Sequence, residues 1–133
     1  MKHIEEVASD GVVLAYIVRA ALVPPTTTFL TPPSMNFQVG LVVVSEGKEI
    51  ARHDHRPVRR HVIGTSEAIF VRKGLCEADV YNAKRELIST HQLREGDVAL
   101  FVGGGHGFRG LEDTVLLEIK QGPYHGLDDK ERF

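Results

Sequence analysis

Short runs of alternating apolar and polar residues recur along the chain and predict a protein built from strands. Eight runs, rich in β-branched or aromatic residues and bounded by Gly, Pro, Asn or Asp, predict strands at residues 12–19, 37–44, 49–54, 68–72, 76–81, 86–90, 98–102 and 114–120. Sustained helical spacing is absent, although residues 2–8 could form one or two turns of helix. Without helices to cover a parallel sheet, the pattern favours an antiparallel all-β fold, a sandwich or a jelly roll.

The clearest local signal is a hairpin in the middle of the chain. Cys76, Ala78 and Val80 alternate with more polar residues, which is the period of a half-buried strand. Residues 82–85 then supply a turn into the strand predicted at 86–90. We therefore expect these two strands to pair with each other.

The domain organisation follows from chain length and from two pairs of prolines. A chain of 133 residues matches one domain. Pro24-Pro25 and Pro32-Pro33 bracket an extended loop that cannot be helical. We expect a single domain over 1–133, with an N-terminal strand and Pro-rich arm at 10–36, a barrel core at about 37–120 and a tail at 121–133.

Charge, cysteine content and hydropathy narrow the function classes. The 16 Lys and Arg residues nearly balance 18 Asp and Glu, so no basic field attracts nucleic acid and a small-molecule partner is favoured. Cys76 is the single cysteine, which excludes an internal disulfide and a multi-cysteine metal site. The longest apolar run, residues 12–18, is too short to cross a membrane, and two acids near the N-terminus are unlike a signal peptide. We expect a cytoplasmic protein.

Seven histidines stand out, and two of them have the spacing of metal ligands. His53 and His55 lie two residues apart at the end of a predicted strand, so both imidazoles project to one side and can bind one metal ion. His106 follows a run of three glycines, and His61 lies between the two regions. His91 is expected to be solvated.

Most of the chain, about residues 37–120, resembles the cupin superfamily through both of its signature motifs. The matching residues are Gly47, His53, His55, Glu67 and Gly74 for G-x5-H-x-H and E-x6-G, and Gly96, Gly104 and His106 for the second motif. The resemblance implies a cupin-type double-stranded β-helix, which is a jelly-roll barrel. It also implies that His53, His55, Glu67 and His106 surround one divalent transition metal at the barrel mouth.

Departures from the motifs leave the fourth metal ligand open. Eleven residues separate His55 from Glu67, whereas the motif has three or four, so either Glu67 or His61 could complete the site. Placing His61 in the first histidine position instead would put Ile63 in the second. In the second motif, Val102 replaces the proline. Imidazoles with or without a carboxylate suit Fe, Mn, Ni or Zn alike.

Further residues are candidates for catalysis and substrate binding. Glu67, His61 or Tyr124 could move a proton, and Arg60 and Arg109 could bind an anionic group of a substrate. Phe108, next to His106, could wall the pocket, whereas Phe101 is expected to fill the core. The tail that contains Tyr124 could be a lid over the barrel mouth or a frayed terminus.

The leading hypothesis is a metal-binding small cupin that acts on a small polar molecule such as a sugar or sugar nucleotide. Isomerase, epimerase and oxygenase chemistry all stay open, because cupins host many reactions. The alternative is a non-catalytic module that binds a small molecule or carbohydrate. A third hypothesis is a structural or oligomer-forming β-barrel. We also expect a homodimer, in which an edge strand such as residues 12–19, followed by the Pro-rich arm, pairs with a second subunit.

Overall fold

The computed structural model describes residues 1–126 and 129–133, and its regular elements are ten strands. They are β1 (Ile4–Ser9), β2 (Val12–Val18), β3 (Thr28–Phe29), β4 (Gly40–Leu41), β5 (Glu67–Lys73), β6 (Leu75–Tyr81), β7 (Leu87–Arg94), β8 (Val98–Phe101), β9 (Gly105–Gly110) and β10 (Val115–Lys120). All pairings are antiparallel, which confirms the all-β prediction. Over the described residues, no helix is long and apolar enough to cross a membrane.

The chain divides into two compact units, which we call the body and the arm. The body comprises Met1–Leu22 and Thr65–Phe133, and the arm comprises Val23–Gly64. The arm takes in the first third of the range 37–120 that the sequence assigns to the barrel core. The arm also extends well beyond the proline-rich loop that the sequence marks.

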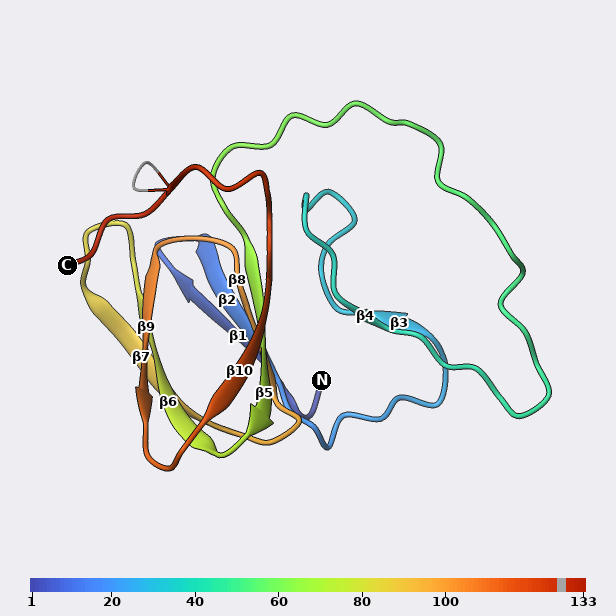
Figure 1. Ribbon diagram of the computed structural model, residues 1–133, viewed down its shortest axis with the longest axis horizontal. Helices are drawn as coiled ribbons and strands as arrows, with labels where there is room; N and C mark the ends of the chain where they lie inside the picture. The colour runs from blue at the N-terminus through green and yellow to red at the C-terminus, as the bar shows by residue number, and fades with distance from the viewer. Residues whose placement is uncertain (127–128) are drawn as a thin grey trace. The chain divides into compact units, whose positions relative to one another are not determined.

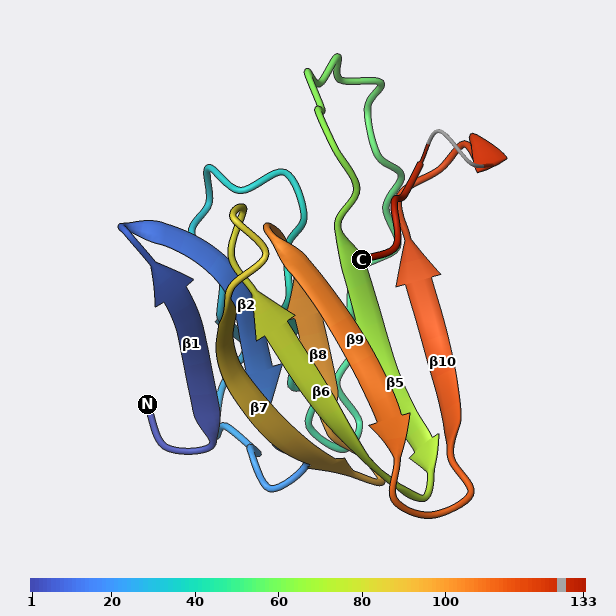
Figure 2. The same cartoon turned by 90° about the vertical axis from the view of Figure 1, so that its left-hand side faces the viewer.

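The body is a sandwich of two antiparallel sheets. One has the order β1-β2-β8-β5-β10 and the other β7-β6-β9, and Figure 2 shows the smaller sheet in front of the larger one. Ile17, Ile69 and Ala99 from the first sheet pack with Ala78 and Val80 from the second in one apolar core. The two sheets stay separate over the described residues and do not close into a barrel.

The predicted central hairpin is confirmed. β6 pairs with β7 from Leu75↔Arg94 to Tyr81↔Leu87. Its turn is organised by Asn82, whose side-chain oxygen accepts hydrogen bonds from the backbone N–H groups of Lys84 and Glu86, each at 3.0 Å. Asparagine side chains favour turns by this kind of local hydrogen bond.

Two strands of the body were not predicted, and neither was the two-residue strand β3 of the arm. The N-terminal residues form β1 rather than a helix, so the expectation of a helical turn at 2–8 is wrong. β1 pairs with β2 through a two-residue turn, Asp10-Gly11, whose φ angles of 53° and 76° suit a type I′ hairpin. β9 pairs along β6 although three of its six residues are glycine.

The arm contains less regular structure than its sequence predicts. The run predicted at 37–44 contributes only the two-residue strand β4, paired with β3, and the run predicted at 49–54 forms no strand. Thr31 is the one buried residue of the fully described range 23–64. The sequence pattern of both runs is that of strands, but residues 42–64 contain no strand in the structure.

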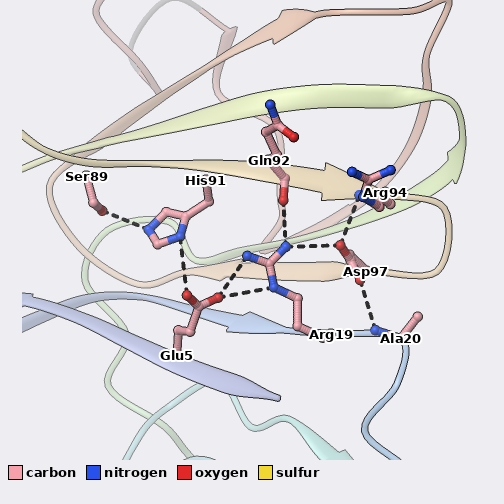
Figure 3. Close-up of polar contacts among 8 residues, drawn as sticks. All are labelled: Glu5, Arg19, Ala20, Ser89, His91, Gln92, Arg94 and Asp97. Carbon is pink, nitrogen blue, oxygen red and sulfur yellow. Dashed lines mark hydrogen bonds and ion pairs between the residues drawn. The ribbon is translucent and has the colours of Figure 1, made fainter. Parts of the chain in front are cut away.

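A polar network ties the two sheets of the body together at the end where β1 begins and β7 ends (Figure 3). The Arg19 guanidinium donates to the Glu5 carboxylate at 2.9 and 3.1 Å and to Asp97 at 3.1 Å, and it also reaches the Gln92 carbonyl on β7. Arg19 thus connects strands β1 and β2 of the larger sheet with β7 of the smaller one.

His91 belongs to the same network, contrary to the expectation that it is solvated. Its side chain is 12% exposed, its Nδ1 lies 3.9 Å from Glu5, and its Nε2 lies 2.8 Å from the Ser89 hydroxyl (Figure 3). Burial lowers the pKa of His91, and Arg19 adds to that effect against the opposing attraction of Glu5.

Candidate functional site

Glu67 and His106 meet between the two sheets of the body, at the end opposite to the Arg19 network. Glu67 is the first residue of β5 and pairs with the buried Phe101 of β8. His106 lies near the start of β9 and pairs with the buried Val80 of β6. Cross-strand partners share a face, so both side chains point inward. The His106 Nε2 and Glu67 Oε2 atoms lie 2.8 Å apart.

Aromatic rings hold the imidazole in place. The His106 ring stacks on Phe101 with centroids 4.0 Å apart and planes inclined by 17°. Phe108 meets Phe101 and His106 edge-on at 5.7 and 5.9 Å. With one ring face against Phe101 and one nitrogen on Glu67, the imidazole has little rotational freedom.

The electrostatics of the pair keep Glu67 ionised. The hydrogen bond with His106 lowers the pKa of the Glu67 carboxyl, and the positive charges of Lys120 and Lys130 lower it further, whereas burial opposes them. The Glu67 and His106 side chains are 15% and 26% exposed. A carboxylate and an imidazole are therefore accessible to a small molecule at this end of the body.

The C-terminal tail lies across the same end. Thr65 donates a hydrogen bond to Asp129 at 2.9 Å, next to the start of β5. At the other side, Arg85 pairs with Glu131 at 3.1 Å and lies over the Phe133 ring. Figure 1 shows this red segment passing over the ends of the strands. Residues 129–133 therefore contact the body at both sides, and Leu127 and Asp128 lie outside the described residues.

The predicted metal ligands fall into two pairs on different units. Glu67 and His106 form the pair in the body, and His53 and His55 form a pair in the arm, with ring centroids 5.2 Å apart. Both arm histidines are exposed, and the Nδ1 atom of His53 lies 2.8 Å from the Ala51 carbonyl oxygen. Within residues 1–126 and 129–133, no three His, Cys, Asp or Glu side chains gather to hold a metal ion.

Two of the proposed substrate-binding residues lie in different surroundings from those expected. Arg109 alternates with Phe108 on β9 and so faces the outer side of the smaller sheet, where it pairs with Glu77 at 2.8 Å. Arg60 is exposed on the arm. Phe108 points inward beside His106, as a wall residue should. The positive charge near Glu67 comes from Lys120 and Lys130, which the sequence analysis did not single out.

Of the remaining catalytic candidates, His61 belongs to the arm and Tyr124 to the body. His61 lies on the arm with an exposed side chain, and its carbonyl accepts a hydrogen bond from Asn36 at 3.1 Å. Tyr124 is 77% exposed, and the Lys120 ammonium lies 5.7 Å from its ring centroid. The sequence analysis assigned Phe101 to the core alone. Its stacking on His106 could not be predicted, because β9, the strand that carries His106, was itself not predicted.

Comparisons with protein-family models, with curated proteins and with solved structures find no match to this chain. The fold and site define an antiparallel all-β protein with a carboxylate–imidazole pair between two sheets.

Proposed function

We propose that this protein is a small cupin, with a double-stranded β-helix as its body, that binds one divalent transition metal and acts on a small polar molecule. The contact between Glu67 and His106 carries the proposal. These residues come from the two separate motifs of the resemblance, and their contact in a partly exposed pair supports a reaction centre at this end of the body. Phe101 and Phe108 give this centre an apolar wall.

The donor chemistry suits a divalent transition metal. Glu67 and His106 offer one carboxylate oxygen and one imidazole nitrogen, and His53 and His55 offer two more nitrogens. Such a set is typical of Fe, Mn, Ni or Zn. A bound ion would supply Lewis-acid polarisation of a substrate oxygen. The first pair lies in the body and the second in the arm, and neither pair alone is a metal centre among the residues that the structure describes.

The chain's own groups suit proton transfer on an anionic substrate. Ionised Glu67 can accept a proton, and its contact with Nε2 of His106 fixes the orientation of the imidazole. Lys120 and Lys130 favour a negatively charged group nearby. Together these features favour isomerisation or epimerisation of a sugar or sugar nucleotide over the other reaction classes.

A non-catalytic binding module is the second candidate. It is favoured by the close contact of Glu67 with His106, which engages one atom of each group within the protein itself. The two candidates differ in one observable. An isomerase exchanges a carbon-bound hydrogen of its ligand with solvent, whereas a binding module does not.

Metal content tests the proposal first. Protein purified without a histidine tag should contain about one divalent metal per chain by inductively coupled plasma mass spectrometry. Glu67→Gln and His106→Ala should lose most of it. Glu77→Gln is the matched control, because Glu77 is also a carboxylate paired across a sheet, but on the outer face. Full metal content in both site variants, or none in the wild type, would refute the metal proposal.

Ligand identity and turnover follow from a second measurement. A thermal-shift screen of sugars, nucleotide sugars and small carboxylates should find a compound that stabilises the wild type but not His106→Ala. Proton NMR in D2O should then show deuterium incorporation into that compound with the wild type only. Stabilisation without exchange would favour the binding module over the isomerase.

A further inference from the structure

The larger sheet of the body has two edge strands, β1 and β10, and neither is the strand that the sequence analysis expected at an edge. β2, which covers most of residues 12–19, pairs with β1 on one side and with β8 on the other, so the expectation of a free edge there is wrong. β1 carries Glu5 and Glu6, and charged residues on an edge strand discourage pairing with another chain. β10 has less of this protection, because four of its six residues are apolar.

Half of the backbone groups of β10, at one edge of the body in Figure 2, have no partner strand. The N–H group of Gln121, directly after β10, donates a hydrogen bond to the Ser66 carbonyl at 3.2 Å. Alternate residues of an antiparallel strand bond to the same neighbour, so Leu116, Glu118 and Lys120 direct their N–H and C=O groups to the free edge. Among the described residues, no other strand and no backbone hydrogen bond reaches this side of β10. Open groups of this kind are a template for pairing with another chain.

The outer face of this edge is apolar. Leu117 and Ile119 of β10 are 44% and 50% exposed, and Phe70, directly opposite Leu117 on β5, is 38% exposed. Ile69, next to Phe70, lies in the core between the sheets, so Phe70 and Leu117 point to the outer face. An apolar row beside an unpaired backbone edge is typical of a strand that pairs with another chain. Every residue of this surface belongs to the body.

The other face of β10 carries two opposite charges that make the strand complementary to itself. Glu118 and Lys120 alternate with the apolar residues, and their charged groups lie 3.9 Å apart. When two copies of β10 run antiparallel with Ile119 opposite Ile119, Glu118 of each copy lies directly opposite Lys120 of the other. Glu118 and Lys120 are also residues whose backbone groups point to the free edge, so each such pair can exchange both N–H···O bonds. Backbone, charge and apolar contacts therefore favour the same arrangement.

We propose that two copies of this chain pair through β10, antiparallel about a two-fold axis at Ile119, so that their larger sheets join into one continuous sheet. Other positions of the axis fit less well. An axis between two residues would set the apolar face of one copy against the charged face of the other. An axis at Glu118 would bring two carboxylates together, and an axis at Leu117 would leave Glu118 opposite Leu116. The interface does not rest on the proposed metal function.

The oligomeric state tests the interface first. Sedimentation velocity of the untagged protein at high micromolar concentration should give a dimer, twice the 14.7 kDa chain mass. Ile119→Asp places two carboxylates against each other at the axis and should give a monomer that is folded by circular dichroism. The control is Val12→Asp, which changes a similarly exposed residue on β2, three strands away from β10, and should stay dimeric. A monomeric wild type, or a dimeric Ile119→Asp, overturns the proposal.

Reversal of the two charges tests how the strands are aligned. Glu118→Lys sets lysines against each other on both sides of the axis and should weaken the dimer about 10- to 100-fold, and Lys120→Glu should do the same with glutamates. An equimolar mixture of the two variants brings unlike charges together again, so sedimentation should show a mixed dimer. Repulsion within one chain would not be relieved by mixing. Variants that do not associate on mixing, or that each dimerise as the wild type does, overturn this pairing.

A disulfide at the axis gives a covalent readout of the same alignment. Residues that face each other in a non-hydrogen-bonded pair have Cα atoms about 4.5 Å apart, which a disulfide can join. Ile119→Cys should therefore run as a covalent dimer in non-reducing electrophoresis after mild oxidation, and the native Cys76 is buried. Leu117→Cys is the matched control, because its two copies would lie about 14 Å apart. Equal or greater cross-linking at position 117, or none at 119, overturns the axis at Ile119.

Discussion

Replacement of Asp97 tests whether burial or ion-pair distance determines the strength of a polar contact in this protein. The Asp97 side chain is 8% exposed and accepts three hydrogen bonds. The donors are Arg19 Nη1 at 3.1 Å and the backbone N–H groups of Ala20 and Arg94, each at 2.9 Å. Asp97→Ala removes all three acceptors at once.

The expected loss is large for one substitution. A buried donor without an acceptor costs about 1–3 kcal/mol. Arg19 at this end of the body is partly exposed, so we take the lower half of that range for each of the three donors and expect a total of about 3–6 kcal/mol. Stability for a domain is about 5–15 kcal/mol, so much of it would be lost. The thermal midpoint should fall by about 10–20 °C.

The control is an ion pair that is shorter but exposed. Arg109 lies 2.8 Å from Glu77, yet its side chain is 67% exposed, and solvent screens such pairs. Arg109→Ala should leave the midpoint close to that of the wild type. Urea and thermal unfolding followed by circular dichroism measure both variants. If Asp97→Ala and Arg109→Ala lose similar stability, burial does not determine how much these polar contacts contribute to stability.

Three further perturbations probe other parts of the body. The pKa of His91 is lowered in the folded protein, so folding favours the neutral imidazole. The wild type should therefore lose stability as the pH drops below about 6.5, and His91→Gln should lose less. Urea melts between pH 7.5 and 5 measure both. Because its pKa is lowered in the folded protein, ionised Glu67 stabilises the fold above about pH 4.5. Glu67→Gln should therefore lose less stability than the wild type as the pH falls below that value. Equal loss of stability at acid pH in the two proteins contradicts this. Gly104 has a φ of 61°, and a Cβ there would lie 2.0 Å from the Tyr81 carbonyl oxygen. Gly104→Ala should therefore lower the free energy of unfolding by about 2 kcal/mol or more. Gly107 has open space around it, so Gly107→Ala should be nearly neutral in the same melts.

The sequence predicted those strands whose alternation of apolar and polar residues and whose turn residues are both regular. The β6–β7 hairpin was found because alternation over 76–81 is regular and Asn82 marks the turn. β1 was missed because Glu5 and Glu6 interrupt its apolar pattern, although the Asp10-Gly11 dipeptide is itself a hairpin signal. β9 was missed because its glycines resemble a loop, and its pairing partner β6 is distant in sequence.

The candidate site shows the same limit. The motifs singled out Glu67 and His106, but their contact depends on the register of β5 and β9 in two different sheets, which spacing along the chain does not encode. Arg109 was chosen for its closeness to His106 in sequence, whereas alternation on a strand turns neighbours to opposite faces. The strands expected at 37–44 and 49–54 have the right pattern, but pattern alone does not provide a partner strand.

The burial of Cys76 makes the protein well suited to thiol-directed labelling. This single cysteine is 1% exposed, and burial raises the pKa of its thiol, so little reactive thiolate reaches solvent in the folded state. A cysteine introduced at the exposed position 63 or 117 would therefore react with a maleimide dye or spin label in the native background, without prior removal of Cys76. Distances between labelled copies could then be measured directly in solution.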